Sequence, residues 1–213
     1  MKHFLFDLDG TLGNTLPLCI QAFQESLQSV TGQSFSGEEI SATFGPCELG
    51  TIRALAPSKE TEALDSYLKR YRALHANWSR PFDGIWEIMD YLHERKAFIG
   101  LITSKGSPST HITLKQYGME DTFRAVKTGV PNGPIKDLQI KETLRDFMMR
   151  PQEVLYVGDS PIDIAASRAA GIRVAAAAWA PTSDADLLRS KNPDFLFTSV
   201  KDFYSFIRTT LHG

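Results

Sequence analysis

Two carboxylates, Asp7 and Asp9, follow a short apolar run near the start of the chain, in the segment Asp-Leu-Asp-Gly-Thr. Alternate residues of a strand point to the same side, so both are expected together at a strand's carboxyl end. A hard cation such as Mg²⁺ relieves the repulsion between them. One carboxylate can also attack phosphorus while its neighbour protonates the leaving oxygen and later activates water. The pair therefore indicates phosphoryl transfer, and turn or capping roles are the alternative.

Two further carboxylates, Asp159 and Asp163, lie in the segment Gly-Asp-Ser-Pro-Ile-Asp, between an apolar run and a helical pattern. Residues four apart at the start of a helix lie on one face, so both can reach a common site. They could supply metal carboxylates from a second strand. The alternative is simple capping, with Ser160 as the N-cap and Asp163 favouring the helix dipole.

Hydroxyl groups that could hold phosphate oxygens follow a third apolar run, which ends at Ile102. Hydroxyls and free backbone N–H groups at a strand end can bind such oxygens. Thr103 is the first polar residue after the run and is predicted to bind phosphate, with Ser104 and Gly10 as further candidates. The stretch Ser-Lys-Gly that starts at Ser104 is also ordinary loop chemistry.

A transferring phosphoryl group needs a fixed positive charge, because negative charge spreads over its oxygens in the transition state. Lys136 is predicted to supply it, since this lysine follows the turn-rich stretch Pro-Asn-Gly-Pro and precedes a helical pattern. Lys105 and Lys127 are its rivals.

Apolar runs bounded by turn signals alternate with helical patterns along most of the chain. Runs without polar alternation suit strands that are buried on both faces. The alternation predicts an α/β fold with a doubly wound, parallel, Rossmann-like sheet. The expected strands are Phe4–Leu8, Ala97–Ile102, Val154–Val157 and Val174–Ala178, with weaker candidates at Phe123–Val126 and Phe195–Phe197. Helices are expected around residues 85–92, 137–149 and 162–170.

Residues 14–80 break this alternation, because they contain helical patterns and no convincing strand. We predict an all-helical cap domain there, inserted into a core domain made of residues 1–13 and 81–213. The first strand ends at Asp9 and the sheet resumes only near Arg80. The insertion would therefore lie over the carboxyl end of that strand, where open α/β sheets bind ligands.

The composition fits a compact soluble globule. The chain has 213 residues, 42% of them hydrophobic, a formal charge of −2 and a pI of about 6.2, with lysine and arginine scattered along it. No electrostatic footprint for nucleic acid or anionic lipid is present. Cys19 and Cys47 offer no disulfide framework, and no apolar run reaches membrane length. We expect a cytoplasmic protein that acts on a small phosphorylated metabolite, without nucleic-acid or membrane partners.

Taken together and in this order, these segments resemble the haloacid dehalogenase superfamily, in particular its phosphoglycolate-phosphatase-like members with a helical, C1-type cap. The resemblance covers the whole chain. Its most specific parts are Asp-Leu-Asp-Gly-Thr-Leu at residues 7–12 and Gly-Asp-Ser-Pro-Ile-Asp at residues 158–163. Thr103 and Lys136 match looser motifs of the superfamily.

The resemblance implies a role for each matching residue. Asp7 would be the nucleophile, Asp9 the general acid and base, Thr103 a phosphate ligand, and Lys136 the charge that links nucleophile and phosphoryl group. Mg²⁺ would be held by the Asp7 carboxylate, the Asp9 backbone carbonyl and Asp159, with Asp163 in support. The chain departs from the pattern at two positions, where members often have an aspartate in place of Asn14 and a proline in place of Asp137.

The expected function is hydrolysis of a small, phosphoglycolate-like phosphate monoester through an aspartyl-phosphate. A sugar phosphomutase of the same fold is one alternative, but the corresponding cap loop at residues 44–50 lacks a basic residue. Phe44, Cys47 and Glu48 of that loop are expected to contact the leaving group. A phosphonate hydrolase would need a cap lysine able to form a Schiff base, and Lys59 and Lys69 resemble solvated helix residues. An inactive binding scaffold is the alternative from another class.

Overall fold

The centre of the protein is a six-stranded parallel sheet with the strand order β3-β2-β1-β4-β5-β6. The structure is a computed structural model, which describes residues 1–78 and 80–211. The strands are β1 (His3–Phe6), β2 (Phe98–Ile102), β3 (Ala125–Lys127), β4 (Val154–Gly158), β5 (Arg173–Ala177) and β6 (Phe195–Phe197). The doubly wound parallel class predicted from the sequence is confirmed. Each strand bound lies within two residues of its prediction, the larger differences being at the end of β1 and the start of β3.

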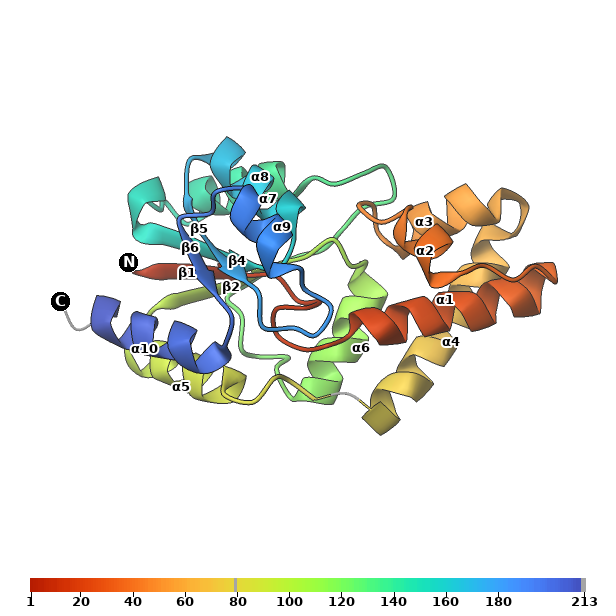
Figure 1. Ribbon diagram of the computed structural model, residues 1–213, viewed down its shortest axis with the longest axis horizontal. Helices are drawn as coiled ribbons and strands as arrows, with labels where there is room; N and C mark the ends of the chain where they lie inside the picture. The colour runs from red at the N-terminus through yellow and green to blue at the C-terminus, as the bar shows by residue number, and fades with distance from the viewer. Residues whose placement is uncertain (79, 212–213) are drawn as a thin grey trace.

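Helices cover both faces of this sheet (Figure 1). Side chains alternate along β1, so Phe4 and Phe6 belong to the core on one face and Leu5 to the core on the other. The Phe4 face is covered by α5 (Ile85–Glu94) and α10 (Val200–Leu211). The short helix η2 (Pro151–Glu153) precedes β4. The Leu5 face is covered by α7 (Lys136–Asp146), α8 (Pro161–Ala170) and α9 (Ala185–Ser190).

Helix α7 is shorter than its pattern predicts. The expected helix reaches Met149, whereas α7 ends at Asp146. The reason is local, because Met148 adopts a left-handed φ of 51°, which an α-helix cannot contain. Met149 is nevertheless buried against the Leu5 face, so its apolar side chain fits the helical pattern without belonging to the helix.

A helical unit, α1–α4, lies beside the carboxyl end of the sheet (Figure 1). It consists of α1 (Leu16–Thr31), α2 (Gly37–Ser41), α3 (Glu48–Leu55), η1 (Pro57–Lys59) and α4 (Glu60–Trp78). Phe23 and Leu27 of α1 pack with Tyr67 and Tyr71 of α4 in a separate apolar cluster. A capping box starts α2, with Ser36 and Glu39 hydrogen-bonded reciprocally.

The helical unit rests on α6 (Ser107–Tyr117), the helix that follows β2. The hydroxyl groups of Tyr71 and Thr113 lie 2.9 Å apart, and His75 Nε2 lies 2.9 Å from the same Thr113 oxygen. Ile112 of α6 joins the apolar cluster of the helical unit. One face of α6 therefore fixes how the helical unit sits over the sheet.

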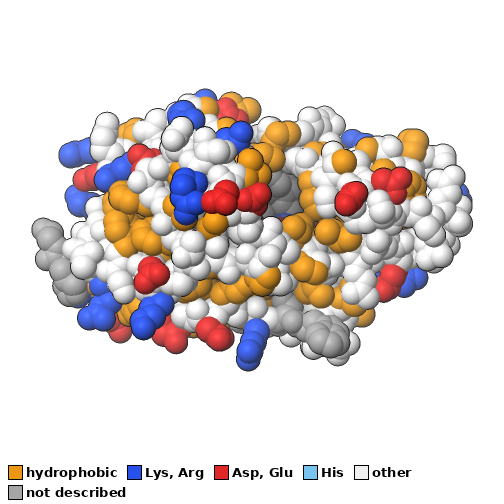
Figure 2. All heavy atoms as spheres, in the orientation of Figure 1, with side chains coloured by type: hydrophobic (Ala, Val, Ile, Leu, Met, Phe, Trp, Pro, Cys, Tyr) orange, Lys and Arg blue, Asp and Glu red, His pale blue; other side chains and the backbone are white. Residues whose placement is uncertain are grey.

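The surface shows no single-sign patch on the face in Figure 2, where lysine and arginine lie among aspartate and glutamate. Hydrophobic side chains lie along both sides of the boundary between the sheet layers and the helical unit (Figure 2). Among the helices of the described residues, none combines the length and apolar character that crossing a membrane requires.

The strand order explains where a site can form. From β1 the chain proceeds to β2 on one side, and β4 lies on the other side of β1. Such a reversal leaves a crevice at the carboxyl ends of the strands, where open α/β sheets bind ligands. The segments with Asp7, Thr103 and Asp159 follow β1, β2 and β4, so all three meet at this edge.

Candidate active site

Three carboxylates meet at the carboxyl edge of the sheet. Asp7, Asp159 and Asp163 each offer one oxygen, and these oxygens all lie within 4.8 Å of one another. Parallel pairing of β1 with β4 explains the meeting, because it sets Phe6 beside Val157. The backbone N–H of Asp7 then donates to the Val157 carbonyl at 2.9 Å. The structure thus brings together the nucleophile candidate and the two carboxylates predicted to support a metal.

Glycine allows the turn after β1 to approach this cluster closely. Gly10 has a φ of +73°, and a Cβ there would lie only 1.9 Å from Asp159 Oδ2. A side chain would therefore be both strained and sterically blocked. Gly10, predicted as a phosphate ligand, has its backbone against the Asp159 carboxylate.

Asp163 uses its two carboxylate oxygens for different partners. Its Oδ2 accepts hydrogen bonds from the Ser160 backbone N–H at 3.0 Å and from the Ser160 hydroxyl at 2.7 Å. Ser160 Oγ in turn accepts from the Asp163 N–H, which completes a capping box at the start of α8. The other oxygen, Oδ1, accepts a hydrogen bond of 2.6 Å from Lys136 Nζ.

Lys136 is the basic group of the acid cluster. Its Nζ lies 2.9 Å from Asp7 Oδ2, and its side chain is 4% exposed. The rival Lys127 pairs instead with Glu142 at 3.4 Å and lies near the surface. Burial alone would lower the pKa of Lys136, but the carboxylates of Asp163 and Asp7 raise it above its ordinary value. Lys136 therefore carries a positive charge at neutral pH.

Burial also changes the two carboxylates next to this lysine. Burial raises the pKa of Asp7 to about 7, Lys136 opposes the rise, and the charges of Asp163 and Asp9 add to it. The pKa of Asp159 is raised well above its ordinary range by burial and then by Asp7. Asp7 Oδ1 is buried and has no hydrogen-bond partner among residues 1–78 and 80–211. A cluster of hard oxygens with one unused acceptor suits a cation, which would keep the carboxylates ionised.

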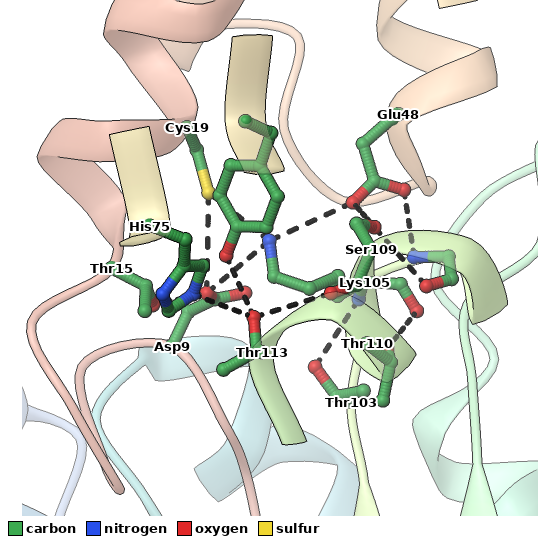
Figure 3. A network of polar contacts seen from close by, with 12 residues as sticks. Asp9, Thr15, Cys19, Glu48, His75, Thr103, Lys105, Ser109, Thr110 and Thr113 are labelled. Carbon is green, nitrogen blue, oxygen red and sulfur yellow. Dashed lines mark hydrogen bonds and ion pairs between the residues drawn. The ribbon is translucent and has the colours of Figure 1, made fainter. Parts of the chain in front are cut away.

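Asp9 lies beside Thr15, Cys19 and Lys105 (Figure 3). Its Oδ1 accepts a hydrogen bond from the Thr15 hydroxyl and lies 3.3 Å from Lys105 Nζ. The thiol of Cys19, on the first turn of α1, lies 4.0 Å from the same oxygen. One carboxylate of the predicted pair thus belongs to the cluster with Lys136, while the other faces a second lysine.

The residues predicted to bind phosphate lie between these two groups. Thr103 is buried after β2, and its backbone N–H donates to the Lys127 carbonyl at 3.0 Å. Its hydroxyl oxygen accepts a hydrogen bond from the Lys105 N–H at 3.2 Å (Figure 3). Thr103 and Ser104 both line the cavity that contains Asp7 and Asp9.

A buried ion network joins the helical unit to the loop after β2 (Figure 3). Lys105 Nζ lies 3.6 Å from Glu48 Oε1, 3.1 Å from Cys19 Sγ and 4.5 Å from the centre of the Tyr71 ring. Glu48 Oε2 accepts from the Gly106 N–H at 2.7 Å, and Glu48 Oε1 accepts from the Ser109 hydroxyl. Lys105, a candidate for the phosphate-binding charge, therefore has its partners in this network.

A cavity of about 220 Å³ lies between the two ion networks. It is lined by most of the predicted site residues, namely Asp7, Asp9, Thr103, Ser104, Lys136, Asp159, Phe44, Cys47 and Glu48. Gly10 and Asp163 lie next to it without lining it. Further lining residues that the sequence did not single out for the site include Leu16, Cys19, Phe23 and Tyr67.

These additional residues come from the inner faces of α1 and α4. Their spacing along the helices predicts packing, and three of them do pack in the apolar cluster of the helical unit. Nothing in that spacing distinguishes a side chain that lines a cavity from one that fills a core. Thr15, which binds Asp9, likewise stands in the sequence as an ordinary residue before a helix.

Comparison with known proteins relates the whole arrangement to one family. Residues 4–177 match the family model described as "Haloacid dehalogenase-like hydrolase". A pyrophosphatase PpaX of Anoxybacillus flavithermus is 29% identical over 212 residues, covering 99% of this chain and 98% of that protein. The corresponding protein of Bacillus pumilus is 28% identical over 205 residues, covering 95% and 94%.

Solved structures of similar shape agree on the fold. A predicted phosphoglycolate phosphatase from Haemophilus somnus superimposes with a TM-score of 0.81 at 20% identity, covering 97% of this chain and 98% of that one. CbbY from Rhodobacter sphaeroides, solved in complex with phosphate, gives a TM-score of 0.78 at 18% identity, with 94% and 95% covered.

Proposed function

Since the chain belongs to the haloacid dehalogenase-like hydrolases, we propose that it is a Mg²⁺-dependent phosphatase that hydrolyses a small organic phosphate ester through an aspartyl-phosphate. One observation carries the proposal. Asp7 has one oxygen 2.9 Å from Lys136, a second buried oxygen without a partner, and two more carboxylates beside it. The relatives named pyrophosphatase and phosphoglycolate phosphatase support a small phosphorylated substrate.

The acid cluster fits Mg²⁺ by the chemistry of its donors. Mg²⁺ prefers a few carboxylates together with waters and substrate oxygens. The Asp7 and Asp159 carboxylates and the Asp9 backbone carbonyl would hold the ion, and Asp163 would support it. When bound, the ion supplies positive charge that neutralises phosphate oxygens.

Attack by Asp7 is the first step that these residues can perform. Lys136 holds Oδ2 at 2.9 Å, which fixes the Asp7 carboxylate in place for attack on phosphorus. The bond from phosphorus to the leaving oxygen breaks as the new bond forms, and Asp9 gives its proton to that oxygen. Thr103 and Ser104, with the backbone at Gly10, would bind the remaining phosphate oxygens.

Hydrolysis of the aspartyl-phosphate reverses the proton transfer. Asp9, now ionised, takes a proton from water, and the water oxygen attacks phosphorus. The Asp7 carboxylate leaves, so inorganic phosphate is released and the nucleophile is restored. Lys136 stabilises the anionic oxygens in both steps, because the neighbouring carboxylates of Asp7 and Asp163 keep it charged.

The helical unit would act as a cap on this chemistry. We place the cap domain at residues 14–80 and the core domain at residues 1–13 and 81–213. The unit leaves the core directly after β1 and supplies Phe44, Cys47 and Glu48 to the cavity wall. A cap excludes bulk water and limits the size of the leaving group.

A simple assay separates this proposal from a binding scaffold. Purified protein should release inorganic phosphate from an aryl phosphate with Mg²⁺, stop when EDTA is added, and resume when Mg²⁺ is restored in excess. Beryllium fluoride, a mimic of the acyl phosphate, should inhibit the Mg²⁺-dependent turnover. Turnover that survives EDTA would contradict the metal role. Failure to hydrolyse any ester of a broad panel would favour the scaffold.

A further inference from the structure

The leaving group must lie beside Asp9, because Asp9 is the carboxylate that would protonate it. Among the described residues that line the cavity, the basic ones are Lys105 and Lys136. Lys136 is held by Asp7 and Asp163. Lys105, 3.3 Å from Asp9, is therefore the cation available for an anionic group on the leaving alcohol.

Lys105 already has partners on several sides. Its ammonium contacts the carboxylates of Asp9 and Glu48 and the Cys19 thiol, and it stands over the ring of Tyr71 (Figure 3). Its side chain is only 2% exposed. An anion that approached Lys105 would have to replace one of these carboxylates.

Glu48 is the carboxylate that occupies the place of such an anion. It comes from the helical unit, yet its oxygens accept hydrogen bonds from the Gly106 N–H and the Ser109 hydroxyl at the start of α6. The N-terminus of a helix and a nearby ammonium are together a favourable position for negative charge. Glu48 occupies this position, and its side chain is only 8% exposed. A second anion beside it would meet the carboxylates of Asp9 and Glu48, which already share the charge of Lys105.

Several of the other side chains at this end of the cavity are apolar. Leu16, Phe23 and Phe44 contribute apolar wall. The Tyr67 side chain also lines the cavity, and its hydroxyl is buried without a hydrogen-bond partner among the described residues. A buried hydroxyl left without a partner is costly, so a polar uncharged atom of a ligand would bind well there.

We propose that this end of the cavity selects phosphate esters whose leaving alcohol is uncharged, partly apolar and able to hydrogen-bond with Tyr67, and that Glu48 excludes leaving groups carrying a carboxylate or a second phosphate. The inference rests on the proposed phosphatase function. It differs from what the names of the relatives would suggest, because phosphoglycolate and pyrophosphate both carry the kind of charge that Glu48 excludes.

The test compares kcat/KM for three phenyl phosphates that differ only at the para position, which carries hydrogen, hydroxymethyl or carboxylate. Phosphoglycolate and pyrophosphate are assayed beside them. The wild-type protein should favour the two uncharged esters over the carboxylate ester by at least about tenfold, since a negative charge on the leaving group would be repelled by Glu48. Phosphoglycolate and pyrophosphate should be poor substrates.

Two substitutions assign the selection to its residues. Glu48→Gln keeps an oxygen for the Gly106 N–H and removes the charge, so the preference for uncharged esters should fall about tenfold or more. Glu38→Gln is the matched control. Glu38 is an exposed residue of α2 that does not line the cavity, so the substitution removes one charge from the helical unit without changing the cavity wall. Tyr67→Phe should lower kcat/KM for the hydroxymethyl ester by a larger factor than for the unsubstituted ester.

The outcomes separate this inference from the proposed function. A preference for anionic leaving groups in the wild type, or an unchanged preference in folded Glu48→Gln, would overturn the inference while leaving a phosphatase. Absence of turnover with every ester would overturn both. Thermal unfolding shows whether Glu48→Gln is folded; if it is not, the wild-type ranking and Tyr67→Phe decide the matter.

Discussion

Lys136 and Asp163 form a buried ion pair, with Nζ 2.6 Å from Oδ1, that joins the first turns of α7 and α8. The Asp163 side chain is fully buried, and its other oxygen is bound by Ser160. The pair therefore fixes Lys136 beside Asp7 independently of any ligand. It also explains how three carboxylates can approach within 4.8 Å in one fold, since one fixed cation lies among them.

Replacing Lys136 should destabilise the protein strongly. Lys136→Met leaves the carboxylates of Asp163 and Asp7 buried without their cation, which typically costs about 3–5 kcal/mol of the free energy of unfolding. Lys127→Met is the matched control, because its pairs are near the surface and worth at most about 1 kcal/mol. Urea unfolding in EDTA measures both, so that no metal compensates. Equal, small losses would show that the buried pair does not hold the cluster.

Removing the nucleophile should abolish turnover and leave the protein folded. Asp7→Asn takes away the attacking anion and changes little volume, so phosphate release from an aryl phosphate should fall to background. Its thermal unfolding should remain cooperative, because the substitution removes a buried charge whose burial is costly. A folded variant that still turned over would exclude Asp7 as the nucleophile.

Asp9→Asn tests the proton-transfer role. The amide keeps the shape that Thr15 and Lys105 contact but cannot give up or take the proton, so kcat should fall by roughly 10² to 10⁴-fold. The loss should be smaller for a leaving group that departs easily as an anion, such as 4-nitrophenolate, than for an alkoxide. A kcat within a few-fold of the wild type for both esters would move the acid role to another group.

Asp159 is expected to act through the metal. Asp159→Ala removes one carboxylate from the cluster, so the Mg²⁺ concentration for half-maximal rate should rise. Asp90→Ala, an exposed position on α5, is the control and should leave the Mg²⁺ titration unchanged. If both variants matched the wild type, Asp159 would be a turn residue at the end of β4 only.

The acid cluster could be anticipated from the sequence because its parts are local. Asp7 and Asp159 each follow a buried apolar strand directly, and parallel strands bring such positions to one edge. The Ser160 and Asp163 pattern supports capping and ligation equally. In the structure one Asp163 oxygen accepts from the capping Ser160 and the other accepts from Lys136. The choice of Lys136 over Lys127 rested on loop context, and the three-dimensional arrangement is what sets Lys136 beside Asp7.

The ion network around Lys105 could not be anticipated in the same way. Cys19, Glu48 and Lys105 come from α1, α3 and the loop after β2, so no spacing relates them. Their meeting depends on how the helical unit sits against α6, which is decided by packing around Tyr71 and His75. Tyr67 lines the cavity, but it lies on the same apolar helix face as side chains that only pack, so the sequence pattern does not separate the two roles.

His75 provides a test of that packing through pH. Burial, followed by the charge of Lys105, lowers the pKa of His75 to about 4, from about 6.5 in the unfolded chain. Between these two values the unfolded chain binds more protons, so this residue contributes stability above pH 6.5 that is lost as the pH falls toward 4.

His75→Gln can keep a hydrogen bond to Thr113 and removes the titration. From pH 7 to pH 5 the wild type should therefore lose more free energy of unfolding than His75→Gln, by at least about 1 kcal/mol. His111→Gln, at an exposed position on α6, should follow the wild type. Urea unfolding at the two pH values measures all three proteins, and parallel losses in the wild type and His75→Gln would show that His75 is not held neutral against α6.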